Sequence, residues 1–370
     1  MRIHEITLYR AELPLTTPYR LSYRTFESFE PLLVELRDRD GRSGWGEQHI
    51  SPGSSAETRD GGWAFARALA EAVVGQEIEA AKRQVGARSA ESPVAATALV
   101  TAMEMLQEAA VLHGKAERRV PLLTAFNATE REAIRAEVEQ RLDQGFRTFK
   151  VKVGQDVEAD IARFAWIQDC LAGRASLRVD ANRAFSRAEG CRFAAAMAPE
   201  GVELFEQPCA AEDWEANAAV AAVSPVPLML DEPICSLADI DRAAGIDGVG
   251  LCKVKLKRFG SLNHLAEAIR AVHARGLRAV LGDGLGAEIN CWMEARVADG
   301  LIDTAGEFNG YVKIRPEARL LAQPLRFEAG EMVLPAGWWP EVDRRRLEQH
   351  CLQRERFASP AVGLGITEVL

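Results

Sequence analysis

Three short runs of the sequence decide the fold: SLRVDA at residues 176–181, VELFEQP at residues 202–208 and PLMLDEP at residues 227–233. Each run is mainly apolar and β-forming, and each carries an acidic residue where the apolar part ends. The stretches between the runs have the apolar spacing of amphipathic helices. Strands that alternate with helices are typical of a parallel sheet, in which each helix returns the chain to the edge where the next strand starts.

The same alternation continues on both sides of this stretch. The further strand-like runs are VPLLTAF (120–126), RTFKVKV (147–153), VGLCKVKL (249–256), RAVLGD (278–283) and IDTAGEF (302–308). Eight parallel strands separated by seven helical segments favour a closed barrel over an open sheet. The predicted fold class is therefore α/β, with a TIM-like barrel as the main body.

The first hundred-odd residues are organised differently. Strands are predicted at 3–13 and 32–37, with a hairpin turn signal at Asp40-Gly41. Two alanine-rich stretches, 56–74 and 94–113, have helical spacing. Strands followed by helices indicate a small α+β domain ahead of the barrel.

Composition argues against several classes of protein. The formal net charge is −9, and no block of lysine and arginine marks a nucleic-acid-binding face. No apolar run approaches the roughly 20 residues that a membrane span needs, and residues 1–10 lack the apolar core of a signal peptide, so a cytoplasmic location is expected. The seven cysteines and six histidines are scattered without a CxxC or HExxH pattern, which argues against a zinc site or a disulfide framework.

The later strand runs each end in an ionisable residue. In chain order these residues are Lys150 with Lys152, Asp180, Glu206, Asp231, Lys255, Asp283 and Glu307, and successive positions from Lys150 onward are 24 to 30 residues apart. The carboxyl ends of all strands of a barrel open onto one face, where active sites lie, so this spacing gathers the groups around one point. A single charged residue at a strand end is as often a solvated loop residue, but the series as a whole predicts a site.

Lys150 and Lys152 lie two positions apart on one strand, so both side chains point to the same side, into the barrel. Two buried ammonium groups need anions nearby, and Asp180, Glu206 and Asp231 supply them. Three converging carboxylates repel one another unless a cation lies between them, and ligands that are all oxygen favour Mg²⁺ over zinc. A salt-bridge network without metal is the alternative.

The residues now assembled resemble the enolase superfamily, specifically the muconate-lactonizing subgroup of the mandelate racemase/muconate lactonizing enzyme family. The matching motifs are Lys150-x-Lys152, Asp180-x-Asn182, Glu206-Gln207-Pro208, Asp231-Glu232, Lys255 five residues before Gly260, and Gly44-Trp45-Gly46-Glu47. The resemblance spans essentially the whole chain and implies a (β/α)₇β barrel with an α+β N-terminal capping domain. We accordingly expect the capping domain at 1–118, the barrel with the active site at 119–325, and a segment 326–370 that returns to the capping domain.

Position by position, the resemblance implies that Asp180, Glu206 and Asp231 hold Mg²⁺, for which Mn²⁺ can substitute. It also implies that Lys152 and Lys255 are acid/base groups on opposite faces of the substrate. Lys150 resembles an electrostatic helper. These roles suit the chemistry, because removal of a proton next to a carboxylate creates an enediolate whose charge a metal stabilises, and because a nearby cation lowers the pKa of a lysine towards the range of a base.

The sequence departs from the family at positions near the substrate. The strand-seven run ends in Asp283 without the histidine of the mandelate-racemase branch. We expect Asp283 at the mouth of the active site, in contact with Lys255 or with the substrate. Glu307 either hydrogen-bonds the substrate or caps the barrel mouth. Lys253 is expected deeper in the barrel than Lys255, and Lys257 at the rim.

The resemblance also implies that loops of the capping domain determine which substrate is bound. The candidate contact residues are Tyr19, Arg20, Tyr23, Arg24 and His49, together with Asn182 from the barrel. The two arginines either meet a distal anion or are simply solvated, and the histidine either contacts a ligand or packs within its loop.

The function predicted is Mg²⁺-dependent proton abstraction next to the carboxylate of a small molecule. Two lysines on opposite faces of a carbanion suit racemisation or epimerisation of an amino- or imino-acid derivative. A cycloisomerase or a dehydratase is the alternative within the family, and a Schiff-base aldolase or a non-catalytic binding protein is the alternative outside it. A homo-oligomer is expected, with neither nucleic acid nor membrane as a partner.

Overall fold

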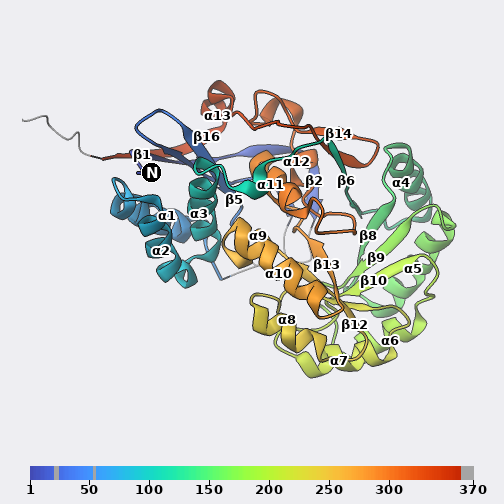
Figure 1. Ribbon diagram of the computed structural model, residues 1–370. Helices are drawn as coiled ribbons and strands as arrows, with labels where there is room; N and C mark the ends of the chain where they lie inside the picture. Colours follow the sequence, from blue (N-terminus) through green and yellow to red (C-terminus); the bar gives the residue numbers. More distant parts are fainter. Residues whose placement is uncertain (21–24, 53–55, 360–370) are drawn as a thin grey trace, which may run out of the picture.

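The computed structural model describes residues 1–20, 25–52 and 56–359, except for the side chain of Arg20. A curled sheet of seven parallel strands, in the order β7-β8-β9-β10-β11-β12-β13, forms the centre of the larger domain (Figure 1). The strands are β7 (Thr124–Phe126), β8 (Thr148–Lys152), β9 (Ser176–Asp180), β10 (Val202–Glu206), β11 (Leu228–Leu230), β12 (Val249–Val254) and β13 (Arg278–Leu281).

A short extended segment around Gly306 closes this sheet. Leu122, just before β7, forms a parallel bridge with Gly306. On the other side, the backbone N–H of Glu307 donates to the carbonyl of Leu281 in β13 at 2.8 Å. The segment acts as an eighth strand between β13 and β7, and the predicted α/β barrel is confirmed.

Helices follow the strands and cover the outside of the barrel. They are α4 (Arg131–Asp143), α5 (Val157–Leu171), α6 (Arg187–Ala196), α7 (Trp214–Val223), α8 (Leu237–Ala244), α9 (Leu256–Phe259), α10 (Leu262–Ala274) and α11 (Glu288–Ala298). Both α9 and α10 follow β12, so the helices fill the seven connections between eight strands. Beyond the eighth strand come α12 (Gly310–Lys313) and a 3₁₀ turn at Pro316–Ala318.

The alternation of side chains along each strand decides what faces the barrel interior. A small buried apolar cluster made of Leu204, Met229, Leu251 and Val280 comes from four neighbouring strands. Side chains two positions further along a strand point to the same side. Glu206 and Lys253 therefore lie above this apolar layer, towards the carboxyl end of the barrel, while Phe205 faces outward into the core beneath the helices.

The capping domain is built on a four-stranded antiparallel sheet in the order β16-β1-β4-β5, covered by three helices (Figure 1). Its elements are β1 (Glu5–Ala11), β4 (Leu32–Arg37), β5 (Ser43–Gln48), β16 (Cys351–Ala358), α1 (Arg59–Val73), α2 (Ile78–Arg88) and α3 (Pro93–Leu106). A hairpin of β2 (Leu13–Arg20) and β3 (Thr25–Phe29) extends from it. The strand β16 brings the end of the described chain back beside β1.

The remaining elements connect the two domains. The strands β6 (Arg118–Pro121), β14 (Arg326–Glu328) and β15 (Glu331–Leu334) form a small antiparallel sheet, and α13 (Arg344–His350) precedes β16. Short 3₁₀ turns lie at Ser89–Glu91 and Ala110–Leu112. The domain boundaries expected from the sequence stay predictions.

Some elements of the capping domain differ from those predicted. The helix expected at 94–113 ends at Leu106, and Glu108 adopts a left-handed conformation with φ 54°, which stops the helix despite the alanines that follow. The helix α2 and the hairpin β2–β3 were not predicted, because neither carries a strong apolar period in the sequence.

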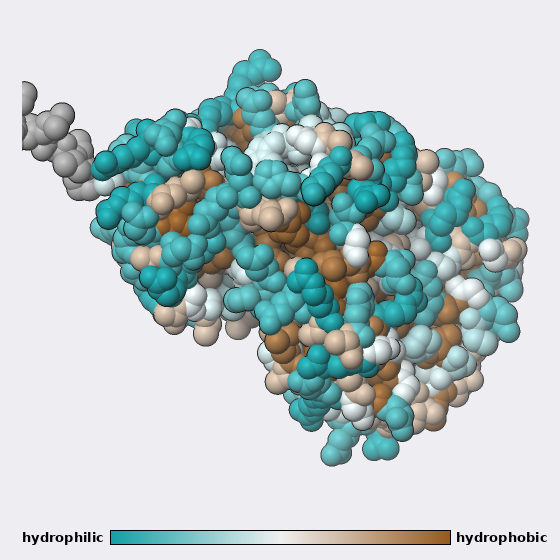
Figure 2. Space-filling model, in the orientation of Figure 1, coloured by the Kyte–Doolittle hydropathy of each residue, from teal (hydrophilic) through white to brown (hydrophobic). Residues whose placement is uncertain are grey.

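Most of the molecular face in Figure 2 is hydrophilic, and apolar residues show in patches between the hydrophilic ones, one of them at the centre of the view. Among the described residues no helix is both long enough and apolar enough to span a membrane.

The Gly44-Trp45-Gly46-Glu47 motif brings β5 unusually close to α3. A Cβ on Gly44 would lie 2.3 Å from the backbone nitrogen of Leu106, and one on Gly46 would lie 1.9 Å from the carbonyl oxygen of Ala98. Only hydrogen atoms fit between strand and helix at these two positions. Trp45 points to the other side and stacks on Tyr9 with ring centroids 5.8 Å apart.

Gly46→Ala is expected to lower the free energy of unfolding by about 3 kcal/mol, because overpacking costs about 1–3 kcal/mol even where atoms can give way. Here the obstructing atom belongs to the backbone of α3. Urea denaturation measures the change. Gly86→Ala in α2 is the control, since a Cβ there meets nothing within 4 Å and alanine favours a helix. Equal stability of Gly46→Ala and the wild type would contradict the close packing.

Candidate active site

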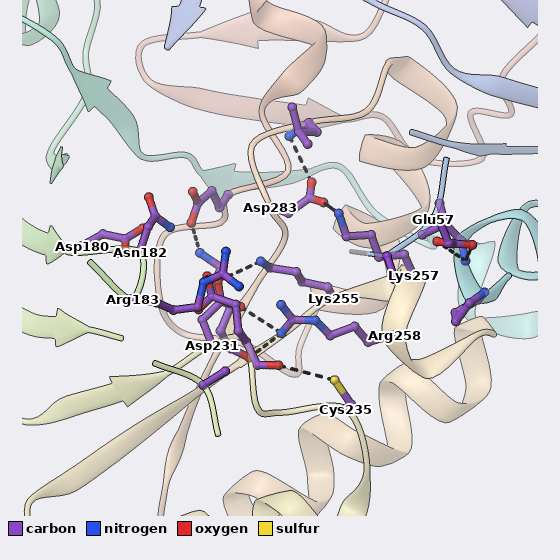
Figure 3. Close-up of a pocket in the computed structure, with 18 of the residues that line it drawn as sticks. Glu57, Asp180, Asn182, Arg183, Asp231, Cys235, Lys255, Lys257, Arg258 and Asp283 are labelled. Atoms are coloured by element: carbon purple, nitrogen blue, oxygen red, sulfur yellow. Dashed lines mark hydrogen bonds and ion pairs between the residues drawn. The ribbon is translucent and has the colours of Figure 1, made fainter. Parts of the chain in front are cut away.

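A cavity of about 530 Å³ opens at the carboxyl ends of the barrel strands and extends to the capping domain (Figure 3). Its barrel side carries nearly all of the predicted polar residues: Lys150, Lys152, Asp180, Asn182, Asp231, Lys255, Asp283 and Glu307. Its capping-domain side includes Tyr19, Glu57, Ala90, Pro93 and Val94. The structure therefore brings the strand-end residues together, as their spacing predicted.

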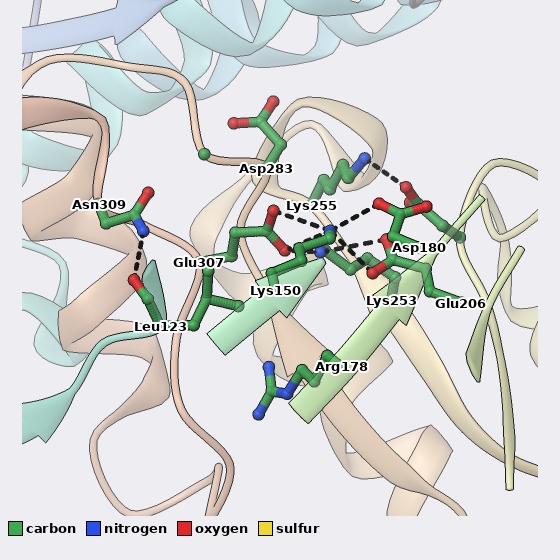
Figure 4. A network of polar contacts seen from close by, with 12 residues as sticks. Leu123, Lys150, Arg178, Asp180, Glu206, Lys253, Lys255, Asp283, Glu307 and Asn309 are labelled. Carbon is green, nitrogen blue, oxygen red and sulfur yellow. Dashed lines mark hydrogen bonds and ion pairs between the residues drawn. The ribbon is translucent and has the colours of Figure 1, made fainter. Parts of the chain in front are cut away.

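Asp180 and Asp231 line this cavity, and Glu206 lies between them on the neighbouring strand; the three residues are 0%, 3% and 1% exposed, respectively. They come from the ends of β9, β10 and β11, which are neighbours in the sheet. Buried carboxylates of this kind require compensating positive charge. Lys150 in β8 and Lys255, directly after β12, provide it (Figure 4).

Lys150 lies at the centre of this network (Figure 4). Its Nζ is 2.8 Å from Asp180 Oδ2, 2.8 Å from Glu206 Oε2 and 2.9 Å from Glu307 Oε1. Burial by itself lowers the pKa of Lys150, but the carboxylates of Asp180 and Glu206 outweigh it and raise the pKa above its usual value. Lys150 is therefore held as a cation and cannot serve as a base.

Lys152 and Lys255 are placed differently, on either side of the acidic residues. Lys152 Nζ lies 2.5 Å from Asp180 Oδ2 and 2.7 Å from Asn182 Oδ1. Lys255 Nζ lies 2.8 Å from Asp231 Oδ2. Burial lowers the pKa of Lys255, which Asp231 only partly offsets, so its neutral form is more accessible than that of an exposed lysine.

Glu307 lines the cavity, and its two predicted roles, a hydrogen bond to the substrate or a cap of the barrel mouth, stay predictions. It is buried and forms ion pairs with Lys150 and with Lys253, so that it balances two ammonium groups inside the barrel. Lys253 is only 1% exposed, as its place deeper in β12 predicted. Burial lowers the pKa of Lys253 to about 7 even though Glu206 raises it.

Asp283 lies in the cavity wall, but its direct partner is Lys257 rather than Lys255. The two side chains form an ion pair at 2.6 Å and are 12% and 11% exposed. Asp283 also accepts a hydrogen bond from the backbone N–H of Leu285 at 3.0 Å. Burial raises the pKa of Asp283, yet Lys257 and Lys255 outweigh it and hold that pKa below its usual value.

The structure places the candidate residues of the capping-domain loops in different surroundings. Tyr19 lines the cavity, and the ammonium of Lys313 lies 4.5 Å from the centre of its ring. His49 is 3% exposed and packs against Phe26 and Phe29, with ring centroids 5.8 Å and 5.3 Å away. It is therefore a packed loop histidine. Tyr23, Arg24 and the side chain of Arg20 lie outside the described residues.

Several lining residues were not predicted. Arg258 donates to Asp231 Oδ1 at 2.9 Å, and Arg183 pairs with Glu232 Oε1 through Nε at 3.1 Å. Glu232 directly follows Asp231 in the sequence, and that adjacency was the available signal. No periodicity or motif marks Ala90, Pro93 or Val94, which reach the cavity only through the packing of the capping domain.

Glu47 joins the capping domain to the barrel face that bears the site. Its carboxylate accepts hydrogen bonds from the backbone N–H groups of Ala287, Ile289 and Asn290 at the start of α11, the latter two at 3.0 and 3.2 Å. It thus caps a helix some 240 residues away in the sequence. Burial raises the pKa of Glu47 to about 7. This contact holds the start of α11, the helix that follows the Asp283 loop, against the capping domain.

The residues present fit a hard divalent cation. Asp180, Glu206 and Asp231 offer only carboxylate oxygens, the ligands that Mg²⁺ prefers. All three carboxylates are buried, and each is paired with a lysine ammonium group. No three acidic, histidine or cysteine side chains of the described chain lie close enough together to hold an ion as they stand. The ammonium groups of Lys150, Lys152 and Lys255 pair with these carboxylates, and a cation would compete with them.

Comparison with known proteins gives consistent matches over most of the chain. The family model described as Enolase C-terminal domain-like matches residues 133–338, more than half of the sequence. A hydrophobic dipeptide epimerase of Citrifermentans bemidjiense is 29% identical over 309 residues, which cover 78% of this chain and 83% of that protein. A muconate cycloisomerase 1 of Acinetobacter baylyi is 25% identical over 361 residues, or 91% of this chain and 96% of that one.

Among solved structures, a dipeptide epimerase from Cytophaga hutchinsonii, crystallised with Mg and the dipeptide D-Ala-L-Val, superposes with a TM-score of 0.87. The superposition covers 96% of this chain and all of that chain, at 20% sequence identity. At that identity the likeness concerns the fold.

Proposed function

We propose that this chain, which belongs to the mandelate racemase/muconate lactonizing enzyme family of the enolase superfamily, is a racemase or epimerase that inverts the carbon next to a carboxylate. Similarity to a hydrophobic dipeptide epimerase, to an L-Lys-D/L-Arg epimerase and to an N-succinyl-L-Arg/Lys racemase supports amino-acid derivatives as substrates. The substrate is thus a small-molecule carboxylate.

One observation carries the proposal: two lysines suited to proton transfer stand on opposite sides of the acidic residues. Lys152 belongs to the second strand of the barrel and Lys255 follows the sixth, and each contacts a different carboxylate. A carbon held between them presents one face to each lysine. Inversion requires this arrangement, because the proton leaves from one face and another arrives on the opposite face.

The roles of the side chains follow from their surroundings. We propose that Asp180, Glu206 and Asp231 hold Mg²⁺, which when bound supplies positive charge that stabilises the developing enediolate. Lys150 remains a cation beside Lys152 and adds positive charge where the enediolate develops. In the direction that starts at Lys152, its neutral amine takes the α-proton while the Lys255 ammonium delivers a proton to the other face. The opposite direction exchanges these roles.

A muconate cycloisomerase activity is the second candidate. The match to the Acinetobacter baylyi enzyme covers 91% of this chain, more than the epimerase match does. In such a reaction only one lysine has to exchange a proton with the α-carbon. We place it second because the relatives named as epimerases and racemases use amino-acid derivatives in both stereochemical forms, which suits two lysines.

Hydrogen exchange in D₂O tests the proposal and separates the two candidates. A panel of N-acylated amino acids and dipeptides, incubated with enzyme and Mg²⁺, is expected to include compounds that gain deuterium at the α-carbon as they invert. Mass spectrometry and chiral chromatography measure both events. An unsaturated or cyclised product in place of an inverted one would replace the racemase by a cycloisomerase or a dehydratase. A homo-oligomeric state, a cytoplasmic location and activity with Mn²⁺ stay predictions.

A further inference from the structure

The ion pair of Arg183 and Glu232 has no part in the proton transfers just described. Arg183 follows β9 and Glu232 follows β11, so the pair spans the end of the intervening strand β10, which carries Glu206. Both residues line the cavity, and Glu232 directly follows Asp231 in the chain (Figure 3). The pair therefore lies in the same cavity as Lys152 and Lys255.

Glu232 presents an oxygen that the described protein does not satisfy. Its Oε1 accepts the ion pair from Arg183 Nε at 3.1 Å, whereas Oε2 is buried without a hydrogen-bond partner among the described residues. A buried acceptor that is left without a donor is costly, so such atoms in cavities are typically completed by a ligand. The ligand must supply a hydrogen-bond donor at this position.

The backbone holds the pair rigidly. Gln207, which is fully buried, accepts a hydrogen bond from the N–H of Arg183 at its carbonyl and another from the N–H of Asp231 at Oε1, both at 2.9 Å. Asn182 and Arg183 have φ of 44° and 69°, a left-handed conformation that costs about 1 kcal/mol or more for each residue other than glycine. A left-handed turn held by these hydrogen bonds thus keeps Arg183 opposite Glu232.

We infer that Arg183 and Glu232 recognise the amide group of an N-acylated α-amino acid: Glu232 Oε2 accepts from the amide N–H, and the terminal N–H groups of Arg183 donate to the acyl carbonyl. This rests on the proposed function, which places the substrate carboxylate at Asp180, Glu206 and Asp231. Arg183 and Glu232, which follow Asp180 and Asp231 in the chain, then face the substituents of the α-carbon. An amide carries one donor and one acceptor, and the pair offers the complementary groups.

The charges of the site favour a neutral amide over a free amine or a second carboxylate. Arg183 neutralises Glu232 in the ion pair, which leaves no net charge to attract an ammonium group. Lys255 and Arg258 nearby further disfavour a cation there. A second carboxylate would instead meet Glu232 Oε2, an acceptor, at close range. A neutral group with a donor meets neither repulsion.

The test compares two substrates that differ only in the amide N–H that Glu232 is proposed to accept. The first is an N-acyl amino acid, and the second is the corresponding O-acyl 2-hydroxy acid, in which an ester oxygen replaces the amide N–H. For the wild type we expect kcat/KM for α-proton exchange in D₂O to favour the amide by about tenfold to a hundredfold, because the ester leaves Glu232 Oε2 without a donor. Calorimetric titration of both compounds in the presence of Mg²⁺ measures the same preference as a ratio of binding affinities.

Glu232→Leu removes the acceptor and is expected to lower the amide-to-ester ratio by about tenfold or more, in exchange and in binding. Glu232→Gln, which keeps an acceptor without the charge, is expected to keep part of the ratio and serves if the leucine variant folds poorly. Glu139→Gln is the matched control, since Glu139 forms an exposed carboxylate–guanidinium pair with Arg174 outside the cavity. It is expected to leave the ratio unchanged.

Two results would overturn the inference while leaving the proposed function intact. One is an unchanged ratio in Glu232→Leu. The other is an equal loss with both compounds accompanied by weaker Mg²⁺ binding, which would place Glu232 in the metal site. Absence of exchange and of binding with both compounds in the wild type would instead overturn the proposed function, and the inference with it.

Discussion

Lys152→Ala and Lys255→Ala are each expected to lower the rate of inversion by about 10³-fold, within the range typical of a lost general acid or base. The two variants should nevertheless differ. Each retains one lysine, so each can still exchange the α-proton of the stereoisomer whose proton faces that lysine. Exchange without inversion is measured by NMR in D₂O with each pure stereoisomer. Each variant is expected to exchange only one stereoisomer, and the two variants are expected to exchange different ones.

Lys152→Arg separates proton transfer from charge. Arginine keeps the positive charge next to Asp180 but cannot act as a base near neutral pH. It should therefore behave like Lys152→Ala in exchange, although its ion pairing is preserved. If one alanine variant still inverted the substrate at the wild-type rate, two-base racemisation would be excluded, and a reaction that uses one lysine would take its place.

The barrel and its polar residues could be predicted because both follow from local rules. Apolar runs at regular intervals predict the strands, and the period of two places Lys150 and Lys152 on the same side. Asp180, Glu206 and Asp231 come together because parallel strands end on one face. None of these inferences requires knowledge of which distant residue meets which.

Contacts between residues far apart in the sequence could not be predicted. For Glu307 the sequence suggested either a contact with the substrate or a cap of the barrel mouth. Its ion pairs with Lys150 and Lys253 could not be predicted, because no rule of spacing selects Lys253 over Lys257. Asp283 meets Lys257 because the short helix α9 turns that side chain back over the barrel mouth. Glu232 pairs with Arg183 because the backbone at Arg183 adopts a left-handed conformation. Sequence patterns predict this conformation mainly at glycine, so it could not be foreseen here.

Removal of divalent metal is expected to reduce activity by about 10³-fold or more, because the ion contributes several kcal/mol of charge stabilisation to the transition state. Dialysis against EDTA followed by readdition of Mg²⁺ or Mn²⁺ measures the loss and the recovery. Full activity in a preparation shown by elemental analysis to lack metal would contradict the assignment of Asp180, Glu206 and Asp231.

Stability provides a second measure that does not depend on the reaction. A ligand that binds only the native protein stabilises it by about 2.7 kcal/mol at a hundred times its Kd, so Mg²⁺ is expected to raise the Tm of the wild type. Glu206→Gln should abolish this rise. It should also lower the Tm without Mg²⁺, because Glu206 neutralises the buried ammonium groups of Lys150 and Lys253. Glu139→Gln, far from the barrel interior, should change neither. A Glu206→Gln protein that gained the full Mg²⁺-dependent rise would show that the ion binds elsewhere.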